Sequence, residues 1–166
     1  IVLIGILLAN VLQSFIWMRF NNQKIVIGEN TLRVNSSFVR NTTLPSANTL
    51  EESVTFLKDN SNPQEVVLIL PYMAGLYFLS ERSNPSKFDN ILAGFINGED
   101  EEKAYIEQLK RSNIRVVIYD PDNGPKMYKQ TLKEYNPLIH AYIMDNYRTI
   151  KTTSEGWLFM RREDVR

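Results

Sequence analysis

The sequence predicts an α/β domain: a mixed sheet with parallel central strands, a C-terminal antiparallel hairpin and flanking helices, preceded by a transmembrane helix. Continuous apolar runs at 64–70 and 114–119 are typical of strands covered on both faces. A helical pattern separates them, and short right-handed crossovers favour parallel neighbours. The strands expected at 147–153 and 156–162 meet at a turn containing Gly156, which indicates an antiparallel hairpin.

The first eighteen residues contain no charged side chain, and Arg19 follows them. As a helix they span about 27 Å, against roughly 30 Å of bilayer hydrocarbon. A signal-peptide core and a buried helix are the alternatives, but no basic leader or small-residue cleavage site is visible. Trp17 beside Arg19 is typical of the membrane–water boundary. We expect residues 1–20 to end a transmembrane helix and residues 21–166 to form an extracytoplasmic domain at the cell membrane.

The less apolar residues of this first segment recur every three or four positions and share one helical face. They are Gly5, Ala9, Asn10, Gln13 and Ser14. Small residues and amides on one face favour packing against other transmembrane helices of the same chain. A single-pass anchor that tolerates a few polar residues is the alternative. The chain begins at Ile1 rather than at a methionine, and we expect it to be part of a longer protein.

Short elements follow the apolar segment. Residues 24–35 read as two short strands that turn at Gly28–Asn30. A helix is expected from Leu50 to Asp59, with Thr49 and Glu52 as its capping box. The first buried strand then runs from Gln64 to Leu70.

Pro71 ends that strand and leads into a short aromatic helix, which stops before Asn84–Pro85. We expect Tyr77 and Phe78 of this helix to lie against the sheet. If part of the stretch is functional, Tyr72 and Arg82 are expected to be its more exposed members, close to Asp120. The structural alternative is that Glu81 and Arg82 pair with neighbours and fix the loop.

A second helix is expected from Glu99 to Ser112. Its first turn, Glu99–Glu102, is acidic, and its last carries Lys110 and Arg111, which matches the helix dipole at both ends. The acidic run could also be taken for a metal site, but the dipole is a sufficient explanation. We therefore expect no metal here.

The strand at 114–119 ends in the turn-forming residues Asp120–Pro125. Two short helices are expected next, at 126–134 and 137–146, with Pro137 suited to a first helical position.

Ligands of open α/β sheets tend to bind beyond the carboxyl ends of parallel strands. Tyr72, Arg82, Asp120 and Asp122 are therefore candidates to face a substrate, such as a sugar or a polar headgroup. The alternative, which we favour for the two aspartates, is that they shape a turn and cap the next helix.

The composition limits the function. Nineteen basic and nineteen acidic residues give a net charge of zero, so nucleic acid is not an expected partner. The chain contains no cysteine, and His140 is its single histidine. No serine stands in a nucleophile-elbow motif and no Gly-rich phosphate loop follows either strand. We expect no catalytic set, metal or cofactor in this part of the protein.

Several short motifs occur in an order that resembles a known family. They are Leu70–Pro71, Tyr77–Phe78–Leu79, Arg82, Asn84–Pro85, Pro137–Leu138, Tyr142, Asn146–Tyr147 and Gly156–Trp157. Between about Glu65 and Arg162 the chain resembles the extracytoplasmic C-terminal domain of multi-pass bacterial glycosyltransferases. These are related to the protein mannosyltransferases and the aminoarabinose transferase. Each motif is weak alone, and their order is what carries the resemblance.

The resemblance implies an enzyme that takes a sugar from a polyprenyl-phosphate carrier, with this lipid-linked donor as a partner. In that family the catalytic aspartate lies in the first external loop between membrane helices, so no catalytic residue is carried over to this sequence. The domain would shape access of the acceptor without performing chemistry. A membrane-anchored binding or sensor domain with one transmembrane helix and no enzyme activity is the alternative.

Overall fold

The structure is a computed structural model and describes residues 22–27, 30–35, 45–122 and 130–162. The chain divides into two compact units, residues 1–44 and 45–166. In the first, β1 (Asn22–Ile27) and β2 (Asn30–Asn35) form an antiparallel hairpin with Ile27 opposite Asn30. The two short strands expected there are confirmed.

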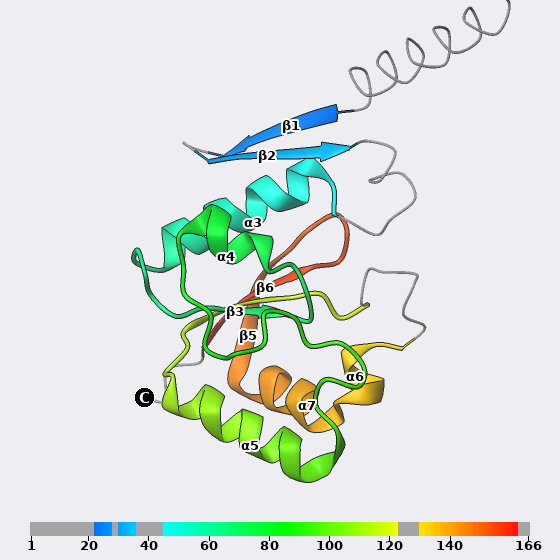
Figure 1. Ribbon diagram of the computed structural model, residues 1–166. Helices are drawn as coiled ribbons and strands as arrows, with labels where there is room; N and C mark the ends of the chain where they lie inside the picture. The colour runs from blue at the N-terminus through cyan, green and yellow to red at the C-terminus, as the bar shows by residue number, and fades with distance from the viewer. Residues whose placement is uncertain (1–21, 28–29, 36–44, 123–129, 163–166) are drawn as a thin grey trace, which may run out of the picture. The chain divides into compact units, whose positions relative to one another are not determined.

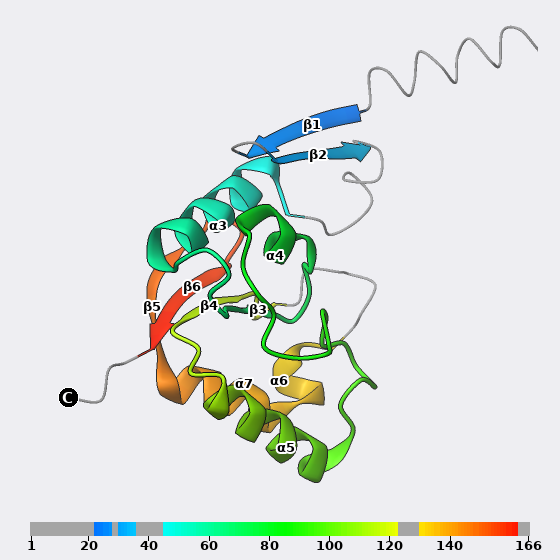
Figure 2. The same cartoon turned by 60° about the vertical axis from the view of Figure 1, so that its left-hand side comes forward.

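The second unit is a mixed α/β domain. Its strands are β3 (Leu68–Leu70), β4 (Val116–Tyr119), β5 (Tyr147–Thr152) and β6 (Leu158–Arg162). Its helices are α3 (Ala47–Asn60), α4 (Gly75–Ser80), α5 (Gly98–Arg111), α6 (Leu132–Tyr135) and α7 (Pro137–Asn146). The sheet lies between α3 and α4 on one face and α5, α6 and α7 on the other (Figures 1 and 2).

The strand order in the sheet is β3-β4-β6-β5. The strands β3 and β4 are parallel, with Leu68 opposite Val117. The strand β6 runs antiparallel to both of its neighbours, β4 and β5. The parallel central strands and the C-terminal hairpin predicted from the sequence are therefore both present.

Both faces of the central strands are covered, which explains their continuous apolar sequences. Leu68, Val117 and Met160 belong to the core that also contains residues of α5 and α7. Alternate residues of a strand point to opposite faces. Phe159 accordingly faces the other side of the sheet, where its ring stacks on Phe56 of α3 at a centroid distance of 4.8 Å.

Several predicted boundaries were wrong, and the strands expected to begin at 114 and 156 begin at Val116 and Leu158. The helix α3 begins at Ala47, because the Ser46 hydroxyl, rather than that of Thr49, accepts the capping hydrogen bond from the Thr49 backbone at 3.2 Å. Glu52 forms an ion pair with Lys151 at 2.8 Å instead of closing a capping box. The first buried strand is also shorter than expected. Before Leu68, the chain makes only an isolated bridge between Val66 and Ser83.

The short aromatic helix α4 divides its two rings between core and surface. Tyr77 is buried, and its hydroxyl oxygen accepts a hydrogen bond from the Ile69 backbone at 3.0 Å. Phe78 is 70 % exposed, so the expectation that it packs on the sheet was wrong. The helix ends where Glu81 adopts a left-handed conformation, with φ 59°. Six residues make fewer than two turns, which is too short for sequence spacing to define a buried face.

The remaining helices agree well with expectation. The helix α5 starts one residue before the predicted Glu99, and α7 has the predicted bounds with Pro137 in its first turn. The helix expected at 126–134 agrees less well: residues 126–129 lie outside the described residues, residues 130 and 131 are not helical, and α6 ends one residue later, at Tyr135.

No helix of the described residues combines the length and the apolar character that crossing a bilayer requires. The transmembrane helix expected at residues 1–20 lies outside the described residues.

Candidate functional site

The parallel strands β3 and β4 end at the same edge of the sheet. Leu70 is opposite Tyr119, and the Asp120 N–H donates to the Leu70 carbonyl at 2.9 Å, which extends the ladder by one bond. Pro71 and Pro121 then follow the two strands. Because proline has no N–H to donate, neither strand continues, and both chains turn away at this edge.

Tyr72 and Asp120 meet at this edge although they are 48 residues apart. The Tyr72 hydroxyl donates to Asp120 Oδ2 at 2.8 Å, and Asp120 Oδ1 accepts the Asp122 N–H at 3.2 Å. Tyr72 is only 9 % exposed, so the expectation that it is among the more exposed members of its stretch was wrong, and Asp120 is 3 % exposed. Burial, and next the charge of Asp120, raise the pKa of Tyr72 far above its ordinary value. The phenol therefore acts as a hydrogen-bond donor and not as a base.

The backbone beside Tyr72 is strained. Met73 has a φ of 89°, a region that residues other than glycine rarely adopt. Such strain persists where the surrounding contacts hold it in place. Met73 is held between two such contacts: the Tyr72–Asp120 hydrogen bond comes one residue before it, and α4 begins two residues after it.

The β5–β6 turn completes the edge. The Trp157 ring packs edge-on against Tyr72, with centroids 6.2 Å apart and an interplanar angle of 84°. Gly156 adopts a φ of 86°, and a Cβ added there would lie 3.7 Å from an Asp122 carboxylate oxygen. The exposed Glu155 accepts the Ser46 backbone N–H at 3.0 and 3.2 Å. Asp122, also exposed, and Glu155 thus lie at the rim above the buried Tyr72.

Arg82 does not join this group. Its Nε donates to the Ser61 hydroxyl at 2.7 Å, and its guanidinium also donates to the carbonyls of Ser80 and Ser61 at 2.7 and 2.5 Å. These acceptors are at the C-terminal ends of α4 and α3, where cations are favoured by the helix dipole. Arg82 is only 8 % exposed, so the expectation that it is among the exposed members of the stretch was wrong.

One polar pair at this edge was missed by the sequence reasoning. The Tyr119 hydroxyl lies 2.7 Å from His140 Nδ1. Burial, and next the charge of Lys133, lower the pKa of His140 below its ordinary value. The imidazole is therefore neutral at neutral pH. The available signal was Tyr119 itself, because a tyrosine that ends a buried strand needs a partner for its hydroxyl.

The edge offers hydrogen bonding rather than an evident reacting group. The exposed carboxylates of Asp122 and Glu155 can accept hydrogen bonds from hydroxyl groups of a ligand. No set of three or more histidine, cysteine, aspartate or glutamate side chains suited to a metal ion occurs within the described residues.

Two surface hollows are lined by other residues than those of this edge. One, of about 470 Å³, is lined by Phe56, Asp59 and Lys151, among others, between α3 and the β5–β6 hairpin. The other, of about 410 Å³, is lined in part by Phe88, Phe95 and Tyr105.

No family model, no curated protein and no solved structure is found to match this chain.

Proposed function

We propose that the chain belongs to an integral-membrane glycosyltransferase that transfers a sugar from a polyprenyl-phosphate carrier to an acceptor. Residues 21–166 would be its extracytoplasmic domain, which shapes access of the acceptor and performs no chemistry. The observation that carries this proposal is the order of the resembling motifs along the chain. The contacts of the motif residues support it, since they hold together elements that are far apart in the sequence.

These contacts recur along the chain. Tyr147 donates its hydroxyl to the Ile114 carbonyl at 3.1 Å, which ties the start of β5 to the segment before β4. The Arg82 guanidinium joins the ends of α3 and α4. Trp157 is buried against Tyr72. These motif residues hold the fold together. We therefore expect proteins that contain the same motifs in the same order to share this fold.

The proposed role in acceptor access rests on the rim of the carboxyl edge. Asp122 and Glu155 are exposed there, while the polar atoms of Tyr72 and Asp120 bond each other beneath them. Exposed carboxylates beyond the carboxyl ends of parallel strands are suited to accept hydrogen bonds from the hydroxyls of an acceptor.

The full-length enzyme tests the proposal. Purified in detergent, it should transfer labelled sugar from a polyprenyl phosphate to acceptors in membranes of the same cells. The double variant Asp122→Asn, Glu155→Gln should raise the KM for acceptor several-fold with little change in kcat. The matched control Glu107→Gln lies on α5, away from the edge, and should change neither value.

Three results would count against the proposal. Absence of transfer by the full-length enzyme would remove the assigned activity. Turnover by purified residues 21–166 alone would contradict a non-catalytic domain. A complete reading frame with no further hydrophobic segment would favour the single-pass binding or sensor domain instead.

A further inference from the structure

The β5–β6 hairpin concentrates positive charge in a protein whose net charge is zero. The two strands contain Arg148, Lys151, Arg161 and Arg162 and no acidic residue. They form one side of the sheet, where β5 is the outermost strand in the described order.

The register of the hairpin brings two of these cations directly opposite each other. Arg148 and Arg161 are cross-strand partners in the antiparallel pair. Phe159 faces α3, and Arg161, two residues further along β6, lies on the same face. Arg148 shares that face because it is opposite Arg161, so both guanidinium groups belong to the α3 side of the sheet.

A register irregularity brings a third cation to the same face. Strict alternation would place Lys151, three residues after Arg148, on the opposite side. The pairing shifts between Thr149 and Lys151, so that Lys151 is opposite Phe159 and lies on the α3 side. There it forms an ion pair with Glu52 at 2.8 Å, so the charge of Lys151 is already balanced.

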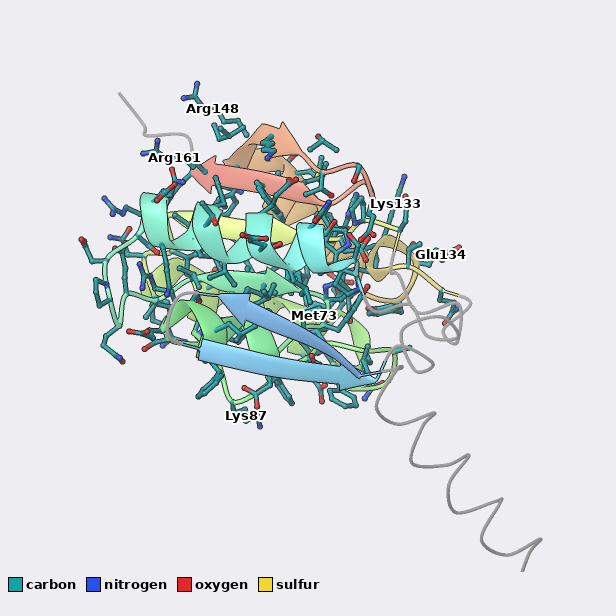
Figure 3. All side chains as sticks on the ribbon, turned by 90° about the horizontal axis from the view of Figure 1, so that it is seen from above. Met73, Lys87, Lys133, Glu134, Arg148 and Arg161 are labelled. Atoms are coloured by element: carbon teal, nitrogen blue, oxygen red, sulfur yellow. The ribbon has the colours of Figure 1, made fainter. Side chains whose placement is uncertain are left out.

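The two opposed arginines lack such a partner. Among the described residues, no carboxylate oxygen lies within 4.0 Å of either guanidinium group, and both side chains are exposed. Figure 3 shows them close together at one end of the sheet, projecting away from the ribbon. By contrast, Arg115 at the same end pairs with Glu65 at 3.0 Å.

Two like charges directly opposite each other on neighbouring strands destabilise a sheet. We infer that this pair is a binding site for a phosphate group, which would lie between the two guanidinium groups. Each guanidinium is a planar fork of N–H donors that can bind two phosphate oxygens at once. A tetrahedral anion has enough oxygens for two forks, and its negative charge would remove the repulsion between them. The phosphate could belong to a soluble anion or to a lipid headgroup, since both offer the same oxygens.

Phosphate-dependent stability tests this site. The full chain, kept in zwitterionic detergent because of its apolar first segment, is melted in phosphate and in chloride at equal ionic strength. Phosphate should raise the Tm of the wild type by a few degrees, because a ligand that binds the folded state stabilises it. Arg148→Gln and Arg161→Gln should each remove this rise, and in chloride each should melt above the wild type. The control Arg111→Gln, on α5, should keep the phosphate response.

A second measurement identifies the source of the phosphate. The side-chain Nε–H NMR signals of Arg148 and Arg161 are followed as inorganic phosphate, or phosphatidylglycerol in the micelles, is added. Shifts with inorganic phosphate support a soluble ligand, and shifts with the lipid alone support a headgroup. The proposal is overturned if neither addition moves these signals. It is equally overturned if the glutamine variants lower the Tm in both salts, because the arginines would then be structural.

Discussion

The polar side chains at the two ends of strand β4 differ in burial and in hydrogen bonding. At its carboxyl end, Tyr72 and Asp120 are buried and bonded to each other at 2.8 Å. At its amino end, Val116 is opposite Arg161, which in turn faces Arg148, and both arginines are exposed. The buried polar pair at the carboxyl end is therefore satisfied within the protein, whereas the amino end presents two cations with no carboxylate oxygen of the described residues within 4.0 Å.

This difference separates residues that hold the fold from residues that can bind something else. A buried polar group costs stability unless it is hydrogen-bonded, so a satisfied pair such as Tyr72–Asp120 is accounted for by the fold. An exposed pair of like charges is not, because the sheet would be more stable without it. Arg82 falls in the first group, since its donors are used on the carbonyls at the ends of two helices.

The largest expected effect comes from alkaline pH. Burial is the main cause that raises the pKa of six tyrosines: Tyr72, Tyr77, Tyr105, Tyr119, Tyr135 and Tyr147. For Tyr105 the value reaches about 12. Above about pH 10 the unfolded chain loses these protons while the folded chain keeps them, so stability falls by about 1.4 kcal/mol per pH unit for each group.

Tyrosinate absorbance and circular dichroism should therefore change together in one cooperative transition above pH 10. A gradual tyrosinate titration near pH 10, with the circular dichroism unchanged, would mean that these phenols are not held in the core. The tyrosines at the carboxyl end of β4 would then be as accessible to solvent as the arginines at its amino end.

Truncation of Arg82 should have the next largest effect. Arg82→Ala should lower the free energy of unfolding by about 3 kcal/mol, because buried hydrogen bonds from a charged group are lost. Denaturant unfolding measures this, with Arg111→Ala, an exposed arginine at the end of α5, as a control expected within about 0.5 kcal/mol of wild type. A small loss of stability at Arg82, together with lost transfer by the proposed full-length glycosyltransferase, would assign Arg82 to function.

Removal of the Tyr72 hydroxyl should cost less. Tyr72→Phe should destabilise the domain by about 2 kcal/mol, since Asp120 loses a donor while the ring still packs on Trp157. The matched variant Tyr135→Phe removes a bond to the neutral carbonyl of Ile91 and should cost about 1 kcal/mol. Equal costs for the two variants would show that the carboxylate adds nothing to the bond.

The smallest effect is expected at Phe78. Because its side chain is 70 % exposed, Phe78→Ala should change the free energy of unfolding by no more than about 0.5 kcal/mol. The neighbouring Tyr77→Ala, in contrast, should cost about 3–5 kcal/mol, as large aromatic truncations in cores do. A similar loss of stability at both positions would mean that Phe78 packs in the core as Tyr77 does.

Strand pairing and helix ends could be predicted where the signal is local. The helix α7 has its predicted bounds because Pro137 fits the first turn of a helix and Tyr147 begins a strand. The start of α3 was misplaced because Ser46 and Thr49 both offer a capping hydroxyl. Glu52, which would have completed the box at Thr49, is drawn to Lys151, 99 residues later.

The candidate site was predicted only in part, because only some of its contacts follow from the order of strands and turns. Parallel strands place their carboxyl ends together, and this was enough to bring Tyr72 near Asp120. Nothing local in the sequence indicates that Arg82 reaches the carbonyl of Ser61, 21 residues earlier. The Arg148–Arg161 pair likewise depends on the register of the hairpin, which the turn sequence alone does not set once β5 contains an irregularity.

One comparison of melting temperatures tests the contrast between the two ends most directly. Wild type, Tyr72→Phe and Arg161→Gln are melted in chloride and in phosphate at equal ionic strength. Tyr72→Phe should melt below wild type by the same amount in both salts. Arg161→Gln should melt above wild type in chloride and lose the rise that phosphate gives. If Arg161→Gln instead melts below wild type in both salts, the opposed arginines serve the fold as Tyr72 and Asp120 do, and the contrast between the two ends is wrong.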